Sequence, residues 1–419
     1  MSAREGSWKE LNSRVMMLYQ RGEYSEAVKV AEESLKVAEK TFGPDHPNVA
    51  ISLNNLGGFY YDVGKYAEAE PLYKRSLAIS EKAFGPNHPN VATTLNNLAE
   101  LCVVQGRYTE AEPLLKRSLA IREKTLSPNH PDVTQSLNNL GALYEAQGKY
   151  AEAEPLFKRS LAIREKTLGP NHPDVAQSLN NLAALYYAQG KYVGAEPLYK
   201  RSLAICEKVF GPNHPDVATS LNNLAELLRA QSKYADAEPL YKRSLTLLEK
   251  AFGPSHPGVA TILNNLAGLY DDQGKYTEAE PLYKQSLAIR EKALGPDHPD
   301  VAQSLNSLAA LYYAQNKYVG AEPLLKRSLA ICEKVFGPNH PDVAKSLNNL
   351  ALLYMAQGKY AEAEPLYKQS LSIYEEALGP NHIDVATVCE NMAECYRKLG
   401  MKDEAEILEG RAKKIRSGR

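Results

Sequence analysis

The sequence predicts an all-α fold, a solenoid of about ten helix-turn-helix repeats stacked one on the next. Two observations lead to this prediction. The nine histidines of the 419-residue chain are spaced 42 residues apart, from His46 to His382. Within each period, two stretches place apolar residues at the spacing of an α-helix. Because one helix hairpin cannot bury its apolar face alone, neighbouring hairpins must stack to form the core.

The prolines follow the same spacing. Nine follow the loop glycine or its substitute, eight follow histidine and eight lie in AEPL-type segments, which accounts for all 25. An inserted catalytic or ligand-binding domain would interrupt this spacing, and nothing interrupts it. We therefore expect a divergent capping repeat at 1–46, eight regular repeats at 47–382, and a capping helix pair with a basic tail at 383–419.

The repeat at 173–214 illustrates each element. Its opening Pro-Asp pair suits the first turn of a helix, where proline loses no hydrogen bond and a carboxylate meets the positive end of the helix dipole. Apolar residues at helical spacing continue to Gly190, which breaks the first helix. A second helix follows and ends at Gly211. Pro197 lies inside its apolar pattern, which predicts either a later helix start or a mild bend.

Composition and charge exclude several classes of protein. Lys and Arg number 49 against 50 Asp and Glu, so the chain has no general attraction to nucleic acid or to an anionic membrane. The N-terminal stretch lacks the apolar core of a secretory signal, and no apolar run is long enough to span a membrane. The five cysteines are odd in number and mostly far apart, which predicts free thiols in a reducing compartment. We therefore expect a cytoplasmic protein.

The regularly spaced histidines do not indicate a metal or catalytic site. One histidine per repeat gives no cluster of three or four ligands, and a catalytic site needs unique rather than replicated residues. Most of them precede proline, where an extended backbone suits a helix N-cap. We therefore expect the histidines to be structural, and we expect no metal, no cofactor and no enzyme activity.

Paired asparagines mark one face of the first helix. LNNL begins at Leu53 and returns in the regular repeats, with LNSL at Leu305. At about 100° per residue, the two asparagines and positions −3, +4, +7 and +8 from the first one form an arc about 120° wide. The repeated leucines at −1, +2 and +5 lie well away from the first asparagine and form the packing face. We call these six positions the Asn face, and it is also where the repeats differ from one another.

The chemistry of the Asn face predicts peptide binding. A carboxamide has donors and an acceptor, so asparagine can pair with the backbone of an extended peptide whatever its side chains. Tyrosine and arginine are enriched at binding hot spots. The predicted groove residues are Asn55, Asn97, Asn139, Asn181, Asn223, Asn265, Asn349, Tyr61, Tyr187, Arg229 and Tyr313. The alternative for any asparagine is a hydrogen bond to the neighbouring repeat, and we expect one of each pair to be partly structural.

Leucines, alanines and tyrosines at fixed positions carry a family resemblance. In the repeat at 173–214 these positions are Leu179, Leu182, Ala183, Tyr186, Gly190, Tyr192, Ala195, Tyr199 and Ser202. They resemble the tetratricopeptide repeat, and the 42-residue period with LGPNHPDVA linkers is similar to the kinesin light chain subclass, over essentially the whole chain. The resemblance implies a right-handed superhelix with a partner segment in its concave groove. It also implies that the second asparagine, such as Asn181, contacts the peptide.

Three functions remain open from the sequence. The leading hypothesis is a scaffold that binds an extended peptide or helix of a partner protein through the Asn face. The alternatives are a self-assembling structural repeat protein and, more remotely, a regulatory array for an enzyme encoded elsewhere. The only cations on the Asn face of the regular repeats are Arg229 and Lys345, and its acidic residues include Glu100, Glu145, Glu226, Asp271 and Asp272. This charge favours neutral or basic partners over the acidic cargo that the resemblance implies, and it disfavours nucleic acid.

Two repeats are nearly identical. The repeats at 173–214 and 299–340 differ only at Asn181/Ser307, Gly190/Asn316 and Tyr199/Leu325. Such near-identity indicates expansion by duplication, so part of the regularity reflects ancestry.

Overall fold

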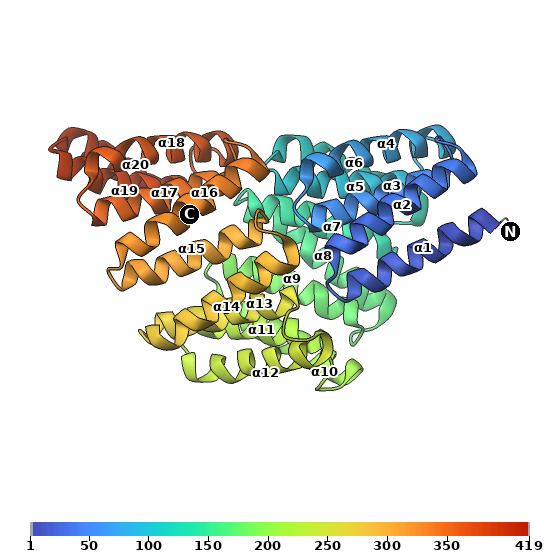
Figure 1. Ribbon diagram of the computed structural model, residues 1–419, viewed down its shortest axis with the longest axis horizontal. Helices are drawn as coiled ribbons and strands as arrows, with labels where there is room; N and C mark the ends of the chain where they lie inside the picture. Colours follow the sequence, from blue (N-terminus) through green and yellow to red (C-terminus); the bar gives the residue numbers. More distant parts are fainter. Residues whose placement is uncertain (1–2, 418–419) are drawn as a thin grey trace. The chain divides into compact units, whose positions relative to one another are not determined.

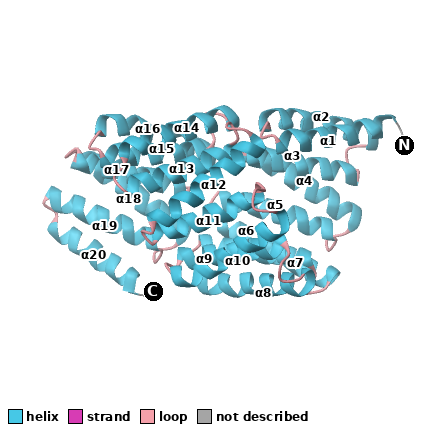
Figure 2. Ribbon diagram, turned by 90° about the horizontal axis from the view of Figure 1, so that it is seen from below, coloured by secondary structure: helices cyan, strands magenta, loops and turns pink. Residues whose placement is uncertain are grey.

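The computed structural model describes residues 3–417, which form helices joined by short loops, with no strand in that range (Figures 1 and 2). The helices are α1 Ala3–Gln20, α2 Tyr24–Phe42, α3 Pro47–Asp62, α4 Tyr66–Phe84, α5 Pro89–Val104, α6 Tyr108–Leu126, α7 Pro131–Ala146, α8 Tyr150–Leu168, α9 Pro173–Ala188, α10 Tyr192–Phe210, α11 Asp216–Ala230, α12 Tyr234–Phe252, α13 Pro257–Asp272, α14 Tyr276–Leu294, α15 Pro299–Ala314, α16 Tyr318–Phe336, α17 Pro341–Ala356, α18 Tyr360–Leu378, α19 Ile383–Leu399 and α20 Lys402–Ser417. The predicted all-α fold is confirmed.

The chain divides into two compact units. The first contains α1–α13 together with residues 292–295, and the second contains the rest of α14 and α15–α20. In the first unit, α1 packs against α2, α3 against α4, and so on to α12, and each hairpin also packs on the next. In the second unit the hairpins α15–α16, α17–α18 and α19–α20 stack in the same way. Each unit is therefore a solenoid of paired helices.

Leucines and small residues of the first helices form the core. Leu179 and Leu185 of α9 are fully buried, and Leu182 is 4% exposed. In most regular repeats a buried serine of the second helix ties it to the first helix of the same repeat. The Oγ of Ser202, for example, donates to the carbonyl of Ala176 at 3.0 Å. The serine is tolerated in the core because this hydrogen bond replaces the one it would make to water.

Histidine caps the first helix of each regular repeat. Nδ1 of His172 accepts a hydrogen bond from the backbone N–H of Asp174 at 3.2 Å. The same contact occurs at all nine histidines. The contact satisfies one of the N–H groups that a helix N-terminus leaves without a partner. The predicted structural role of these residues is confirmed.

Proline is accommodated inside the second helix. α10 begins at Tyr192, upstream of Pro197, so of the two alternatives the later helix start is wrong. Pro197 is exposed, and because proline has no N–H, the carbonyl of Val193 lacks its helical donor. Val193 is itself 88% exposed. Water can therefore hydrogen-bond this carbonyl, which lowers the cost of an interior proline.

Most second helices end at a glycine in a backbone region that side chains rarely adopt. Gly169 has φ 88° and ψ 157°, while Ser127 holds φ 84° and ψ 150° at the equivalent position of its repeat. A Cβ in this region costs about 1–3 kcal/mol, so Ser127 is strained.

Replacing Ser127 with glycine is expected to raise the free energy of unfolding by about 1 kcal/mol, because the strain at this position is released. Native-state hydrogen exchange of the amides in α6 and α7, the helices on either side of Ser127, measures the change. Gly169→Ser is the matched control and should lower the free energy of unfolding by a similar amount. Equal stability of Ser127→Gly and the parent protein would contradict the prediction.

Candidate peptide-binding face

The Asn face lies apart from the leucine core, as the angular arithmetic predicts. In α9, Gln177 is exposed and Asn181 and Tyr187 are half-buried, whereas Leu179 and Leu185 on the opposite side are fully buried. The second asparagines of the other regular repeats are likewise half-buried or exposed, while the leucines at position −1 are buried. A partner that contacts this face can therefore do so without opening the core.

Some second asparagines bind the preceding repeat. The Nδ2 of Asn97 donates to the Oδ1 of Asn54 at 3.1 Å. Asn265 makes the same bond to Asn222 at 2.9 Å. Asn139 instead donates to the Glu100 carboxylate at 2.5 Å. These three asparagines are thus partly structural, which is the alternative that the sequence left open.

Other second asparagines are without such a bond. Within residues 3–417, the side chains of Asn55, Asn181 and Asn349 make no hydrogen bond. The Oδ1 of Asn223 accepts a long bond of 3.4 Å from its neighbour Asn222. The predicted groove asparagines therefore form two classes, those that bond the preceding repeat and those that do not. Both classes occur in the same LNNL sequence.

The first asparagines are more deeply placed. Asn96 is fully buried and Asn138 is 8% exposed. Several of their amide oxygens are buried with no hydrogen-bond partner: those of Asn96, Asn138, Asn180, Asn264 and Asn306. A buried acceptor without a donor is costly, so this part of the face favours ligands that bring N–H or O–H groups.

The three predicted tyrosine anchors share one arrangement. Each packs against the tyrosine that opens the second helix of its own repeat, with ring centroids 5.5 Å apart for Tyr61 and Tyr66 and for Tyr187 and Tyr192. Tyr313 is 41% exposed, and burial raises the pKa of Tyr61 and of Tyr187 above the usual range. The rings are held in place and partly accessible, as anchors require.

Arg229, the cationic residue among the predicted anchors, is paired within the protein. Its Nε donates to the Asp272 carboxylate one repeat further on at 2.6 Å, and Glu226 lies 3.6 Å from its Nη1. The carboxylate of Glu226 also accepts a hydrogen bond from the Tyr241 hydroxyl. Arg229 therefore links α11 to α13. The sequence indicates this pair, because Arg229 is at position +7 of its repeat and the oppositely charged Asp272 is at position +8 of the next repeat.

Three carboxyl groups of the first unit lie in surroundings that disfavour their charge. Burial raises the pKa of Glu145 to about 7 and that of Asp62 to about 6, although a hydrogen bond from Tyr19 opposes the shift of Asp62. Burial also raises the pKa of Glu100, against its bond from Asn139. The Glu145 carboxyl group makes no hydrogen bond or ion pair with any described residue. A cation brought by a partner would stabilise these carboxylates.

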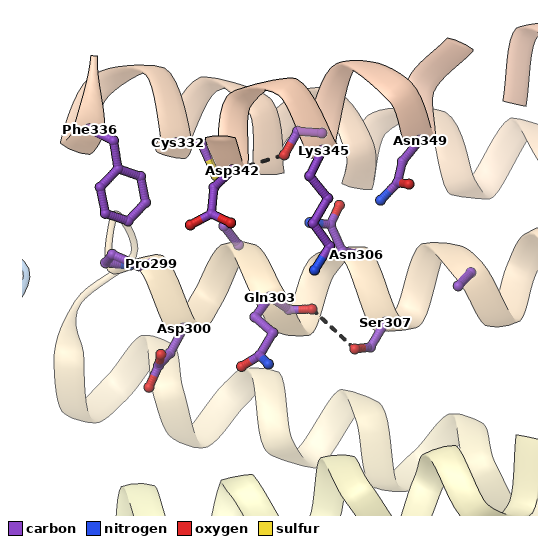
Figure 3. A pocket seen from close by; sticks show the side chains of 13 residues that line it. Pro299, Asp300, Gln303, Asn306, Ser307, Cys332, Phe336, Asp342, Lys345 and Asn349 are labelled. Carbon is purple, nitrogen blue, oxygen red and sulfur yellow. Dashed lines mark hydrogen bonds between the residues drawn. The ribbon is translucent and has the colours of Figure 1, made fainter. Parts of the chain in front are cut away.

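Two adjoining hollows lie on the Asn face of the second unit, between α15 and α17. The larger, of about 520 Å³, is lined by polar residues that include Gln303, Ser307 and Lys345. The smaller, of about 170 Å³, is lined mainly by apolar side chains, and Asn306 and Asn349 border both. Figure 3 shows Asn306 and Asn349 on facing helices, with Lys345 extending toward Asn306. Of the residues that line the two hollows, only Asn349 and Tyr313 are among the predicted groove residues.

Other kinds of site are not found in the part of the chain that the structure describes. No group of three or more histidine, cysteine or acidic side chains in this part is arranged to hold a metal ion. The five cysteines are buried and unpaired. None of the described helices combines the length and the hydropathy needed to cross a bilayer.

Solved structures of several repeat proteins are similar to the chain. A putative kinesin light chain from Podosopora anserina, with nearly identical repeats, is 31% identical over 49% of this chain and 97% of that chain, with a TM-score of 0.42. BtubC (BKLC) from P. vanneervenii is 24% identical over 59% and 92%, with a TM-score of 0.43. A Rap protein complexed with Competence and Sporulation Factor is 16% identical over 89% and 99%, with a TM-score of 0.57. No curated protein matches the chain significantly.

Family models cover nearly the whole chain. One tetratricopeptide repeat model matches eight overlapping segments: 50–124, 99–166, 132–206, 174–250, 216–292, 258–334, 317–364 and 342–417. A second tetratricopeptide repeat model matches residues 11–48. These matches agree with the paired helices and with the buried alanines, leucines and tyrosines of each repeat. The chain therefore belongs to the tetratricopeptide repeat family.

Proposed function

We propose that this protein is a non-enzymatic interaction scaffold whose Asn face binds an extended segment of a partner protein. The family consists generally of protein-interaction modules, which supports the broad function. One observation carries the finer proposal. Asn55, Asn181 and Asn349 are half-buried or exposed, and their side-chain amides make no hydrogen bond. Each such amide can pair with a peptide N–H or C=O, worth about 0.5–1.5 kcal/mol per bond.

The charge of the first unit bears on the kind of partner. Glu145 carries no counter-ion, and Arg229, the cation of this face in the first unit, is paired with Asp272. A segment with lysine or arginine would supply donors and positive charge, whereas an acidic segment would add to the repulsion. We therefore propose that the first unit selects a segment with at least one basic side chain.

Selection from a library of random displayed peptides tests this function. The parent protein is expected to enrich peptides that the Asn55/Asn181/Asn349→Ala triple variant binds at least about tenfold more weakly, through the loss of several backbone hydrogen bonds. Asn97/Asn265→Ala is the matched control, because its amides bond neighbouring repeats. It should affect stability more than peptide binding.

Three outcomes would contradict the proposal or a part of it. Equal peptide binding by the triple variant and the parent protein would show that the asparagines without a bond do not contact the ligand. Concentration-dependent oligomers in light scattering, with no peptide enriched, would favour the self-assembling alternative. Enriched peptides without lysine or arginine would overturn the preference for a basic side chain.

A further inference from the structure

The smaller hollow in the second unit occupies space that an aromatic ring fills in other repeats. The ring of Tyr73 lies against position +3 of its own first helix, where a Cβ added to Gly57 would be 2.8 Å from the ring. Phe157 lies in the same way against Gly141, at 2.9 Å. Six of the eight regular repeats carry a tyrosine or phenylalanine at this position of the second helix, and the other two carry Leu115 and Leu325.

Leu325 replaces this ring in the repeat at 299–340. The repeat at 173–214 has Tyr199 at the same position, and the two repeats differ at only two other places. Tyr199 and Leu325 are each 5% exposed, so both are part of the core. Because leucine is shorter than tyrosine, the space beyond it is left as the hollow of about 170 Å³ beside Ala309 and Ala310.

A second difference between these repeats enlarges the opening. Ser307 stands where the earlier repeat has Asn181, and its hydroxyl is turned back to the Gln303 carbonyl at 3.1 Å (Figure 3). Ser307 lines the larger hollow, which adjoins the smaller one at Asn306 and Asn349. Two of the three differences between near-identical repeats therefore shorten a side chain at this one place on the Asn face.

The size and lining of the smaller hollow indicate what it can hold. An apolar protein cavity of about 150 Å³ is known to hold benzene, so this hollow has room for one aromatic ring. Leu325, Leu352 and the ring of Tyr313 supply apolar walls. Asn306 borders the hollow, and its amide oxygen is buried with no hydrogen-bond partner. A hydroxyl group on the ring would supply the missing donor.

We propose that this hollow is a specificity pocket for the side chain of a tyrosine in the bound partner segment. The ring replaces the one that Leu325 lacks, and its hydroxyl donates to the Oδ1 of Asn306. The rest of the segment follows the larger hollow, past Gln303 and Lys345. This inference rests on the proposed function, since it names the residue that the partner presents to the Asn face of the second unit.

Binding of p-cresol, the side-chain analogue of tyrosine, tests the pocket without any peptide. Saturation-transfer NMR with the full chain is expected to show saturable binding, about fivefold tighter than that of toluene, which lacks the hydroxyl. Leu325→Tyr should weaken p-cresol binding at least about tenfold, because the protein's own ring then fills the space. The near-identical repeat already carries tyrosine at this position, so this variant is expected to fold.

A second variant and its matched control separate filling of the pocket from general damage. Ala310 lines the hollow at position +4, where another repeat has Glu226. Ala310→Glu should therefore also abolish p-cresol binding. Ala184→Glu makes the same change in the repeat that carries Tyr199 in place of Leu325, and it should leave p-cresol binding unchanged.

Several results would overturn the pocket. The proposal is wrong if p-cresol does not bind the parent protein. It is also wrong if p-cresol still binds both the Leu325→Tyr and the Ala310→Glu variant. Equal affinity for toluene would overturn the role of Asn306. The peptide selection distinguishes this failure from failure of the proposed function. If parent and Leu325→Tyr proteins enrich the same peptides without a preference for tyrosine, the Asn face binds peptides and the pocket is wrong.

Discussion

Replacing Arg164 with alanine is expected to lower the free energy of unfolding by about 3 kcal/mol. Arg164 lies on α8 and is 8% exposed. Its side chain links α8 to the preceding helix α7 and to the following helix α9. Its Nε donates to the Thr134 hydroxyl at 3.0 Å, and its Nη1 donates to the Asp174 carbonyl at 2.8 Å and to the Ser178 hydroxyl at 3.1 Å. Alanine would leave these buried acceptors without donors and would open a cavity.

Hydrogen exchange is the most direct measurement of this effect. A repeat array unfolds in segments, so a global urea transition averages over repeats that the substitution does not touch. Protection of the amides in α8 and α9 should fall in Arg164→Ala, and protection in α17 to α20 should not change.

Arg159 provides the matched control on the same helix. Its side chain is 40% exposed and pairs with Glu123 at 2.6 Å on the surface. Since exposed ion pairs contribute about 0–1 kcal/mol, Arg159→Ala should have little effect. Arg164→Cys introduces the residue that the chain itself has at Cys206 and Cys332, and it should cost less than alanine. Equal losses for Arg164→Ala and Arg159→Ala would contradict the role of the buried arginine.

Replacing Glu145 with glutamine is expected to stabilise the protein by about 2 kcal/mol at about pH 8, and to have almost no effect near pH 4. Burial raises the pKa of Glu145 from 4.5 to about 7. Because the folded-state pKa lies above the unfolded value, the folded state loses stability as the pH rises through this interval. The shift corresponds to about 3 kcal/mol, and residual contact with solvent reduces that figure.

Thermal unfolding at several pH values measures the effect of Glu145→Gln. The gain in the free energy of unfolding should appear between about pH 4.5 and pH 7 and then level off. Glu152→Gln, at an exposed position of α8, is the control and should give the same stability as the parent protein throughout. A gain of the same size near pH 4 would indicate a packing effect rather than removal of charge. Such a result would also remove the physical reason for a basic partner segment.

The 42-residue period, and the order of residues within each repeat, predicted most of the fold. Histidine, proline and glycine at fixed intervals fix where helices begin and end, since their effects are local to the backbone. Leucines at helical spacing separate the buried side of each first helix from the Asn face, as Leu179 and Asn181 illustrate. The start of the second helix was harder to predict, because exposure of Pro197 to water depends on how the hairpins pack.

The details of the candidate site could not be predicted in the same way. Asn97 and Asn181 occur in the same LNNL sequence, yet Asn97 bonds Asn54 and Asn181 makes no such bond. Arg229 pairs with an aspartate that lies 43 residues away in the sequence. These contacts depend on side chains from two adjoining repeats, and so on their relative placement.

The sequence by itself determined that this protein is an array of helix hairpins with one variable face, because periodic spacing acts through local backbone geometry and burial. Only the tertiary structure decided which polar groups of that face are already satisfied and where it is hollowed. The three differences between the repeats at 173–214 and 299–340 are plain in the sequence. Their consequence, a hollow beside Leu325, appears only when α15, α16 and α17 are packed together, because empty space is a property of packed neighbours.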